Sequence, residues 1–434
     1  MKLSSCNDLA FDVIVCGAGS AGVAAACAAA REGAKTLLLE RYGFAGGILT
    51  AAMIHTFDAI KSCRDNGITV VGGFASALLA EVESLHGIIT DDNPGEALTV
   101  HPEILKIAVD RLLRQHGVTT FYHALAIDVL KQQDRVIGVE AALRDGRARL
   151  HARVVIDATG DADLAYHAGA PCTLDAELQP MTYHFRLGGV DPKPDWQQWE
   201  ELTRAALQAA HVAGEIEVFG GPWIIRLGAT EISLNTTRVR GNPLDPREVS
   251  DAEQAGRAQM LRIWEVLRRR VPQLARSYIL AGASQLHIRE SRKIRGDYML
   301  TEDDIRHGTR FPDTIAVGAW PIDIHPADRV GVHPHKDDAP MPYEIPFRCL
   351  LPEGVEGLLV AGKPISTTHR AHGSTRVPGT SIATGQAAGV AAALAAAAGT
   401  TPRRVEIETL RTRLRAQQAI VSASELAGAG PDAS

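Results

Sequence analysis

The chain has 434 residues, and 45 basic against 51 acidic side chains leave it a formal net charge of −6. At about 150 residues per domain, this length predicts two or three packed units and excludes a mostly disordered chain. The negative charge argues against general binding to the phosphate backbone of nucleic acids. Forty glycines, long alanine tracts and an aromatic content of 5% are typical of an α/β fold in which backbones approach each other closely.

The first forty residues have the pattern of a βαβ unit. Residues 11–16 form a short apolar run that stops at Gly17, and alanine-rich sequence continues to Arg31. Residues 35–40 (KTLLLE) then read as a second buried strand that ends in an acid. We therefore predict two neighbouring parallel strands joined by a helix.

Two helices and a β-rich segment come next. Helices are expected near residues 73–85 and over residues 102–116, where apolar residues recur at helical spacing. The pattern then changes to short strands separated by turn residues, over residues 121–130, 136–143 and 150–158. These three segments predict a β-meander, inserted before the parallel sheet resumes.

The amino-acid composition changes after about residue 170. Charged helices such as residues 251–270 follow, and from Glu356 the chain returns to glycine and alanine, with a strand at residues 357–362. A long helix after Pro378 and a surface helix over residues 405–418 close the chain.

These features predict the α/β fold class, with two domains. Residues 1–170 and 340–434 form a split Rossmann-like domain that carries the inserted β-meander. Residues 171–339 form a second, mixed α/β domain.

The cysteines show none of the C-x-x-C spacing of zinc, iron–sulfur or dithiol sites, and they are Cys6, Cys16, Cys27, Cys63, Cys172 and Cys349. A reduced, cytoplasmic location is the simplest interpretation. The uncharged stretch at residues 377–402 is almost long enough to span a bilayer. Its glycines and weakly apolar alanines predict a buried helix and no membrane span.

A glycine-rich turn follows the first predicted strand. Residues 17–22 (GAGSAG) match G-x-G-x-x-G between a strand and a helix. Glycine permits a tight turn and close approach of a pyrophosphate, and the helix N-terminus adds unpaired N–H groups and a partial positive charge. Glu40 ends the second strand and is placed to accept both ribose hydroxyls of an adenosine. Together these residues predict a dinucleotide site.

Three features favour FAD over NAD. The inserted β-meander departs from a simple nicotinamide-binding domain. Asp161, after Gly160, follows the last strand and is expected at the carboxyl edge of the sheet, where a ribityl or phosphate group is bound. Residues 373–389 (GSTRVPGTSIATGQAAG) read as a second glycine-rich loop that leads into a helix, whose N-terminus can face an electron-rich flavin ring.

Six motifs are spread along the chain: RYGFAGGILTAAM (41–53), ATGDADLA (158–165), ESRKIRGDYMLTEDDI (290–305), GAWPIDIH (318–325), YEIPFRCLLP (343–352) and LLVAGKPISTTHRAHGSTRVPGTSIATGQAAG (358–389). Through them the sequence resembles the bacterial FAD-dependent oxidoreductases of the glutathione-reductase fold, in the branch related to fumarate reductase and succinate dehydrogenase flavoproteins. The sequence departs from the common pattern at Arg370, where relatives usually have an acid, and at Ser381, where many have cysteine.

The resemblance implies that the split domain binds FAD and that the middle domain covers the flavin as a substrate domain. It also implies that Glu40 binds the adenosine ribose and that Gly46 and Gly47 pass close to the flavin. The predicted FAD-binding residues are Gly17, Gly19, Ser20, Ala21, Gly22, Glu40, Arg41, Gly46, Gly47, Ala126, Gly160, Asp161, Arg376, Thr380, Ser381 and Ile382.

The predicted catalytic residues are His325, His369, His372 and Arg292. Histidine is the natural proton-transfer group near neutral pH, and the three histidines lie in motifs expected on both sides of the cleft. His325 is favoured, because it precedes a Pro-containing loop from which a side chain can emerge into the cleft; the alternative is a histidine that caps that loop.

Arginines suggest an anionic substrate. Arg289, Arg292 and Arg295 recur every three residues and would share one face of a helix, either as a salt-bridge network with Glu290 or as forks for a substrate carboxylate. The arginines expected to border the cleft are Arg186, Arg226, Arg289, Arg292, Arg370 and Arg376.

A metal site is the weaker interpretation of the histidines at residues 325, 333 and 335 with Asp337 and Asp338 nearby. The stretch is rich in proline and glycine and lacks helical spacing, so a solvated loop is favoured and no metal is predicted.

These observations predict an FAD-dependent oxidoreductase that oxidises a small polar, anionic metabolite by hydride transfer to flavin N5. Two alternatives stay open. One is reduction of an activated alkene, and the other is a non-redox reaction of sulfur chemistry or tRNA modification, in which the dinucleotide is structural. Since no second G-x-G-x-x-G suits NADPH, we expect oxygen, a quinone or a carrier protein as the electron acceptor. The sequence leaves open the oligomeric state, with a homo-oligomer as one option, and whether FAD is covalently attached.

Overall fold

The structure is a computed structural model that describes residues 9–63, 67–89, 98–191, 196–330 and 340–426. A central parallel sheet has the order β6-β2-β1-β9, with β18 also paired to β9. Its strands are β1 (Ala10–Cys16), β2 (Thr36–Glu40), β6 (Thr119–Tyr122), β9 (Gly146–Asp157) and β18 (Leu358–Val360). This arrangement confirms the predicted Rossmann-like core.

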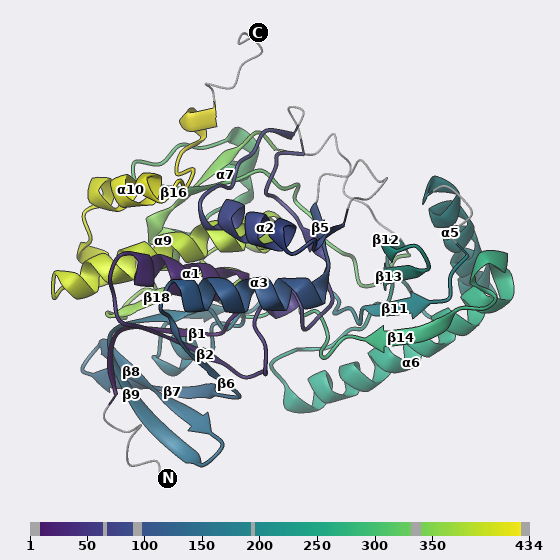
Figure 1. Cartoon of the computed structure of the whole chain (residues 1–434), viewed down its shortest axis with the longest axis horizontal. Coiled ribbons are helices and arrows are strands. Elements are labelled where there is room, and N and C mark those ends of the chain that lie inside the picture. Colours follow the sequence, from purple (N-terminus) through teal and green to yellow (C-terminus); the bar gives the residue numbers. More distant parts are fainter. Residues whose placement is uncertain (1–8, 64–66, 90–97, 192–195, 331–339, 427–434) are drawn as a thin grey trace.

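The β-meander lies across one face of this sheet (Figure 1). It is formed by β7 (Leu125–Gln132), β8 (Arg135–Leu143) and the first half of the long strand β9, which pair antiparallel. The second half of β9 joins the parallel sheet, so one strand belongs to both layers.

Alternate residues of β1 enter two different cores. Val13 and Val15 pack with the helices, whereas Ile14 and Cys16 pack toward the β-meander. This period of two explains why the strand is apolar throughout, because a parallel strand covered on both faces buries every side chain.

Helices cover the other face of the sheet, as Figure 1 shows. They are α1 (Ser20–Arg31), α2 (Phe74–Ser84), α3 (Pro102–Gln115) and α9 (Pro378–Ala397). A Cβ on Gly385 would lie 2.2 Å from the backbone oxygen of Ala21, and one on Gly389 equally close to that of Ala25. The glycines and alanines of α1 and α9 therefore permit contact between the two backbones.

Helix α9 is long and apolar enough to cross a membrane, but 83% of its apolar window is buried inside this fold. Packing against α1 and the sheet accounts for its composition, as predicted.

A second layered unit contains the antiparallel sheet β12-β13-β11-β14 and two long helices. Its elements are β11 (Phe185–Gly188), α5 (Trp196–Val212), β12 (Trp223–Gly228), β13 (Glu231–Asn235), α6 (Pro246–Arg270) and β14 (Tyr278–Gly282). Figure 1 places this unit to the right of the parallel sheet. It confirms the prediction of a mixed α/β unit.

Shorter elements complete the fold: β3 (Thr56–Phe57), β4 (Ile88–Ile89), β5 (Leu98–Val100), α4 (Asp163–His167), β10 (Cys172–Thr173), β15 (Lys293–Ile294), α7 (Glu302–His307), β16 (Thr314–Gly318), β17 (Tyr343–Pro346), α8 (His369–Thr375) and α10 (Ile407–Ala416). Ile315 and Val317 of β16 share a core with α1 and α9, although they precede the predicted domain boundary at residue 340. The exact domain bounds stay a prediction.

Two local expectations were wrong. Residues 289–292 form no helix, and Arg289, Arg292 and Arg295 diverge, because the segment runs extended into β15. Gly373 lies within α8 rather than in a loop. The chain breaks instead at Val377, whose extended conformation (φ −73°, ψ 159°) is favoured because Pro378 follows it.

Candidate functional site

A cleft with about 1200 Å³ of empty space opens at the carboxyl ends of the parallel strands. Its walls include the residues that follow β1, β2, β9 and β18, and a segment at residues 285–289 between β14 and β15. In open α/β sheets this edge is where ligands bind.

The glycine turn brings the start of α1 to the cleft. Gly17 has φ +95°, and a Cβ there would lie 2.4 Å from the backbone oxygen of Ala158. A Cβ on Gly47 would lie 2.6 Å from the Cα atom of Gly19. Among the described residues, no side chain caps α1, and its first turn has no acid. The first N–H groups of the helix are therefore available to an anion such as a pyrophosphate.

Glu40 connects β2 to this turn. Its carboxylate accepts hydrogen bonds from the backbone N–H groups of Ala18 (2.7 Å) and Tyr42 (2.9 Å). Burial raises the pKa of Glu40, although these hydrogen bonds lower it. Each carboxylate oxygen can accept more than one hydrogen bond, so Glu40 can also accept ribose hydroxyls from the cleft.

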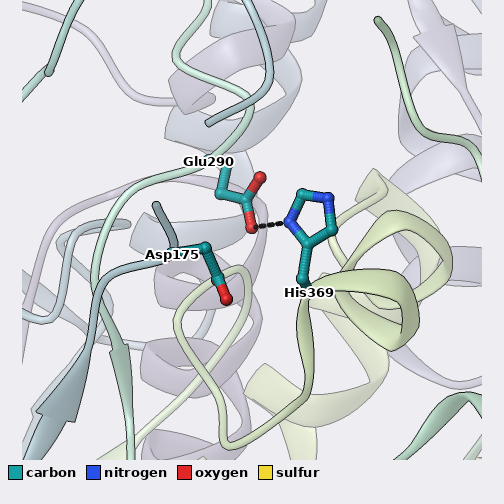
Figure 2. A group of neighbouring side chains, drawn as sticks. All are labelled: Asp175, Glu290 and His369. Atoms are coloured by element: carbon teal, nitrogen blue, oxygen red, sulfur yellow. Dashed lines mark hydrogen bonds and ion pairs between the residues drawn. The ribbon is translucent and has the colours of Figure 1, made fainter. Parts of the chain in front are cut away.

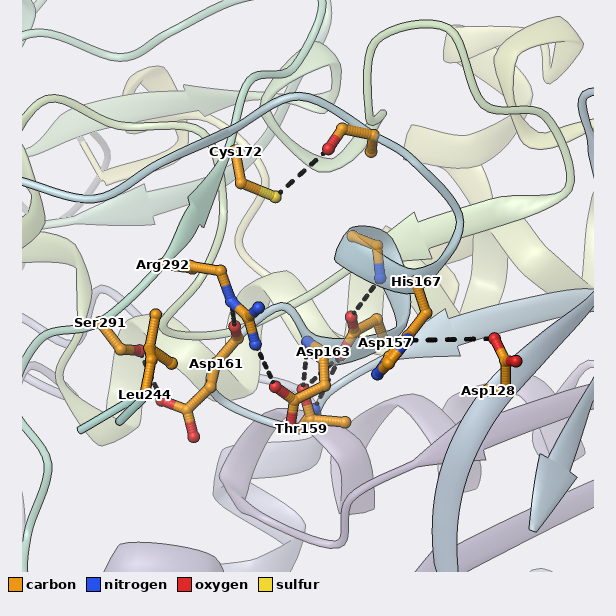
Figure 3. Close-up of polar contacts among 12 residues, drawn as sticks. Asp128, Asp157, Thr159, Asp161, Asp163, His167, Cys172, Leu244, Ser291 and Arg292 are labelled. Atoms are coloured by element: carbon orange, nitrogen blue, oxygen red, sulfur yellow. Dashed lines mark hydrogen bonds and ion pairs between the residues drawn. The ribbon is translucent and has the colours of Figure 1, made fainter. Parts of the chain in front are cut away.

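Asp161 lies where the sequence predicted it, on the loop after β9 (Figure 3). Its carboxylate accepts hydrogen bonds from the hydroxyl of Ser291 and from Nζ of Lys363 (3.0 Å). Burial raises the pKa of Asp161, but the Lys363 charge and the Ser291 hydroxyl outweigh burial, and the pKa lies below its ordinary value. Sequence reasoning missed Lys363. The pattern that could have found it is a Gly-Lys pair directly after a buried strand.

The N-terminus of α9 also faces the cleft through Pro378 and Ser381. In the described part of the chain no side chain caps this helix, and its first turn has no acid. Two uncapped helix N-termini, those of α1 and α9, thus meet at one cleft. Both favour negative charge, as the phosphates and the electron-rich flavin pyrimidine of FAD would supply.

Arg289 and Arg376 line the cleft and are both buried, and this part of the wall is called the deep end below. Nη2 of Arg376 donates a hydrogen bond to Oδ2 of Asp323 (2.9 Å). Arg289 is 2% exposed, and Nη1 donates to the backbone oxygen of Pro180 (2.7 Å) and to the hydroxyl of Thr182. Burial and then the Arg376 charge lower the pKa of Arg289 to about 9.

Within the described residues, no carboxylate forms a salt bridge with Arg289, although the charge of Asp323 favours its charged form, whereas Arg376 pairs directly with Asp323. A guanidinium whose pKa is about 9 stays charged at neutral pH. Arg289 is therefore a buried cation that an anionic ligand can neutralise.

Twelve of the sixteen predicted FAD residues line the cleft: Gly17, Gly19, Ser20, Ala21, Glu40, Arg41, Gly47, Ala126, Gly160, Asp161, Arg376 and Ser381. The other four support it from behind. A Cβ on Gly22 would lie 1.8 Å from the backbone oxygen of Gly17, and Gly46 makes a turn (φ +110°) against Thr50. Thr380 and Ile382 are fully buried in the first turn of α9.

The four predicted catalytic residues do not line the cleft. His325 does not emerge into it, contrary to expectation: its ring is buried, and Nε2 bonds Oδ2 of Asp323 (3.0 Å). Burial lowers the pKa of His325 to about 4, against the effect of Asp323. His325 thus lies behind Arg376, joined to it through one carboxylate.

His372 and Arg292 are held by other partners. His372 is fully buried, and its Nε2 bonds the backbone oxygen of Arg289 (3.0 Å). Arg292 donates to Oδ1 of Asp163 (2.6 Å) and to the backbone oxygen of Asp161 (3.1 Å), as Figure 3 shows. Both residues support segments that line the cleft.

His369 belongs to a cluster with Glu290 and Asp175 (Figure 2), whose ligand-type atoms lie within 4.8 Å of one another. Nδ1 of His369 bonds Oε1 of Glu290 (2.9 Å). Such a set can bind a metal ion, but the ammonium of Lys293 already contacts both carboxylates and is almost completely buried. The donor set therefore fits an ion-pair network better than a metal centre.

His333, His335, Asp337 and Asp338 lie outside the described residues.

Two of the six arginines predicted to border the cleft do so, Arg289 and Arg376. Arg186 pairs instead with Glu231, and Arg370 with Glu302. Sequence reasoning missed Tyr42, Gln285, His287 and Lys363, which also line the cleft.

Comparison with one solved structure supports the fold. A geranylgeranyl bacteriochlorophyll reductase-like protein from Thermoplasma acidophilum aligns with a TM-score of 0.50 and 14% identity, over 96% of this chain and 90% of that one. A myxobacterial chondrochloren halogenase aligns with a TM-score of 0.48 and 16% identity, over 94% and 79% of the two chains. At such identities the likeness concerns the fold alone.

Sequence comparisons identify the family. The chain is 28% identical over 148 residues to the tRNA uridine 5-carboxymethylaminomethyl modification enzyme MnmG from Christiangramia forsetii, a match that spans 31% of this chain and 22% of that relative's length. The family described as "FAD dependent oxidoreductase" matches residues 12–414, nearly the whole chain. The protein therefore belongs to the FAD dependent oxidoreductase family and is an enzyme whose cofactor is FAD.

Proposed function

We propose that the enzyme oxidises a small polar metabolite that carries a carboxylate, with bound FAD accepting the substrate hydride at N5. The observation that carries this proposal is Arg289, a buried cation that lines the cleft and forms no direct salt bridge among the described residues. A planar guanidinium suits bidentate recognition of a carboxylate.

The other cleft residues have separate tasks. The turn at Gly17 and Gly19 and the start of α1 hold the pyrophosphate, and Glu40 holds the adenosine ribose. Asp161 and Lys363 neutralise each other at the wall, and the α9 N-terminus stabilises negative charge beside it. Asp323 fixes the position of Arg376, so that its charge stays at the cleft.

The finer assignments are also proposals. The motifs given above support placement in the branch related to the fumarate reductase and succinate dehydrogenase flavoproteins, and the same cationic site would serve reduction of an alkene conjugated to a carboxylate. Oxygen, a quinone or a carrier protein reoxidises the flavin. All five described cysteines are free, in keeping with a reducing, cytoplasmic setting.

The partial match to MnmG makes tRNA an alternative substrate. A net charge of −6 disfavours it, because tRNA binding depends on basic surfaces that contact phosphates.

Anion binding tests the proposal. We would titrate the FAD-loaded enzyme with oxalate, a small dicarboxylate with no hydride to give, and record the visible flavin spectrum. Removing a charge-assisted hydrogen bond costs about 1.5–3 kcal/mol, so Arg289→Gln should weaken oxalate binding about tenfold to a hundredfold.

Two further variants serve as controls for the oxalate titration. Arg289→Lys keeps the charge and should restore part of the affinity, and Arg204→Gln removes a distant cation on α5 and should bind oxalate normally. Equal oxalate affinity in wild type and Arg289→Gln would contradict the proposed anion site.

A further inference from the structure

Among the 16 histidines of the sequence, His287 is the one that lines the cleft in the described part of the chain. Its backbone is fixed by a bridge to Thr182: the N–H of His287 donates to the backbone oxygen of Thr182 (2.8 Å), and the N–H of Thr182 donates back (3.2 Å). The segment from residue 285 to 289 thereby holds His287 beside Arg289, at the deep end of the cleft.

The ring of His287 forms no hydrogen bond among the described residues, which is also true of the buried His55, but His55 does not line the cleft. The side chain is 5% exposed, its Nδ1 is completely buried, and neither ring nitrogen has a hydrogen-bond partner in the described residues. In His325 and His372 Nδ1 is likewise buried and unpaired, but Nε2 of each is bonded. Buried polar atoms are nearly always paired, so an unpaired imidazole at a ligand cleft points to a ligand that supplies the partner.

The surroundings of His287 keep its ring neutral. Burial lowers its pKa well below the ordinary value, and the charges of Arg289, Arg376 and Lys363 lower it further. The ring of His184 lies behind it, with centroids 6.1 Å apart and planes at 61°. His184 is itself buried, and burial lowers its pKa too. Burial and these cations disfavour a protonated ring, so His287 can accept a proton only while the negative charge of a bound substrate offsets them.

We propose that His287 is the catalytic base, which accepts the O–H or N–H proton of the substrate while Arg289 holds the substrate carboxylate. This inference rests on the proposed function. The substrate carbon loses its hydrogen with both bonding electrons to oxidised FAD, and the neighbouring oxygen or nitrogen loses its proton to a ring nitrogen of His287. A C=O or C=N bond forms, the substrate is oxidised by two electrons, and FAD is reduced by two.

Anaerobic flavin reduction in three variants tests this role. With the carboxylate that bleaches the wild-type flavin fastest, His287→Gln should slow flavin reduction about 100-fold or more and retain its FAD, because glutamine keeps much of the shape and removes the basicity. His211→Gln makes the same chemical change on α5, where His211 bonds the backbone oxygen of Ile216, and should react normally. His325→Gln tests the rival base.

A second readout does not depend on turnover. Ring-nitrogen NMR of histidine-labelled enzyme, with the His287 signal assigned by its loss in His287→Gln, should show a neutral ring at neutral pH. Addition of glycolate, the smallest hydroxycarboxylate, to the holoenzyme should shift this signal and leave that of His211 unchanged. A protonated ring, or a signal that glycolate does not move, would overturn the inference.

The outcomes separate this inference from the proposed function. If carboxylates bleach the wild type and His287→Gln about equally fast, His287 is not the base, and the proposed function stands. If only His325→Gln loses reduction, the base is His325. If no carboxylate bleaches the wild type, the proposed function fails and this inference fails with it.

Discussion

Glu40 accepts a hydrogen bond from the backbone N–H of Ala18 at 2.7 Å, so the end of β2 is tied directly to the glycine turn that follows β1. One carboxylate thus connects the two strand ends that the cofactor must bridge. Its second bond, to the N–H of Tyr42, fixes the chain as it leaves β2. The acid and the turn therefore form one binding element.

Glu40→Gln should weaken FAD retention by about 1.5–3 kcal/mol, because it removes a charge-assisted contact to the ribose and keeps the side-chain shape. The measurement is equilibrium binding of FAD to the apoprotein by flavin fluorescence. Glu83→Gln, an exposed acid on α2, is the control and should bind FAD like the wild type. Normal FAD affinity in Glu40→Gln would place the ribose contact elsewhere.

Two glycine substitutions separate cofactor binding from folding. Gly19 has φ −74°, and an added Cβ would come no closer than 3.8 Å to another atom, so Gly19→Ala should fold. Its methyl group would enter the cleft at the predicted pyrophosphate position, and FAD should be lost. In Gly385→Ala the Cβ would lie 2.2 Å from the backbone oxygen of Ala21, which should lower the free energy of unfolding by about 1–3 kcal/mol or more.

Urea unfolding of the two apoproteins, together with their FAD content, checks this pair. An unstable Gly19→Ala, or a Gly385→Ala as stable as the wild type, would show that the packing around α1 differs from that described.

The His369–Glu290 pair predicts a pH-dependent contribution to stability. The hydrogen bond from His369 to Glu290 raises the pKa of His369, whereas burial and the Lys293 charge lower it. When the pKa of a histidine is higher in the folded than in the unfolded state, protonation stabilises the fold at pH values below the ordinary histidine pKa. This stabilisation is lost as the pH rises through the folded-state pKa. His369→Gln should therefore lower the urea midpoint more at about pH 5.5 than at about pH 8.5, on either side of the ordinary pKa of about 6.5.

The Glu290→Gln background is the control for this prediction. Without the Glu290 carboxylate, the effect of His369→Gln should depend much less on pH, because only Asp175 then raises the pKa of His369. A larger effect at alkaline pH would mean that His369 is stabilised in its neutral form.

Sequence patterns predicted the parts of the site that depend on local structure. The position of Gly17, Gly19 and Glu40 follows from one βαβ unit, whose periodicity and glycine spacing are visible within forty residues. The uncapped start of α9 is also local, since Pro378 marks it.

The deep end of the cleft depends on contacts between distant segments, which no local pattern contains. His287 reaches the cleft because its backbone pairs with Thr182, over a hundred residues earlier. Lys363 gains its role only when β18 lies beside β9 and brings it to Asp161. His325 was favoured on its motif, but Asp323 and the surrounding core hold its ring away from the cleft surface.

The most direct test of the account is anaerobic bleaching of the FAD-loaded enzyme by matched pairs of compounds, each pair being a hydroxy or amino acid and its primary amide. The two members share the hydride and the proton to be removed and differ only in the negative charge that Arg289 is proposed to bind. The account predicts that the visible absorbance of the oxidised flavin disappears with at least one acid and stays with its amide. Bleaching by the amides as fast as by the acids, or by neutral and cationic compounds alone, would contradict it.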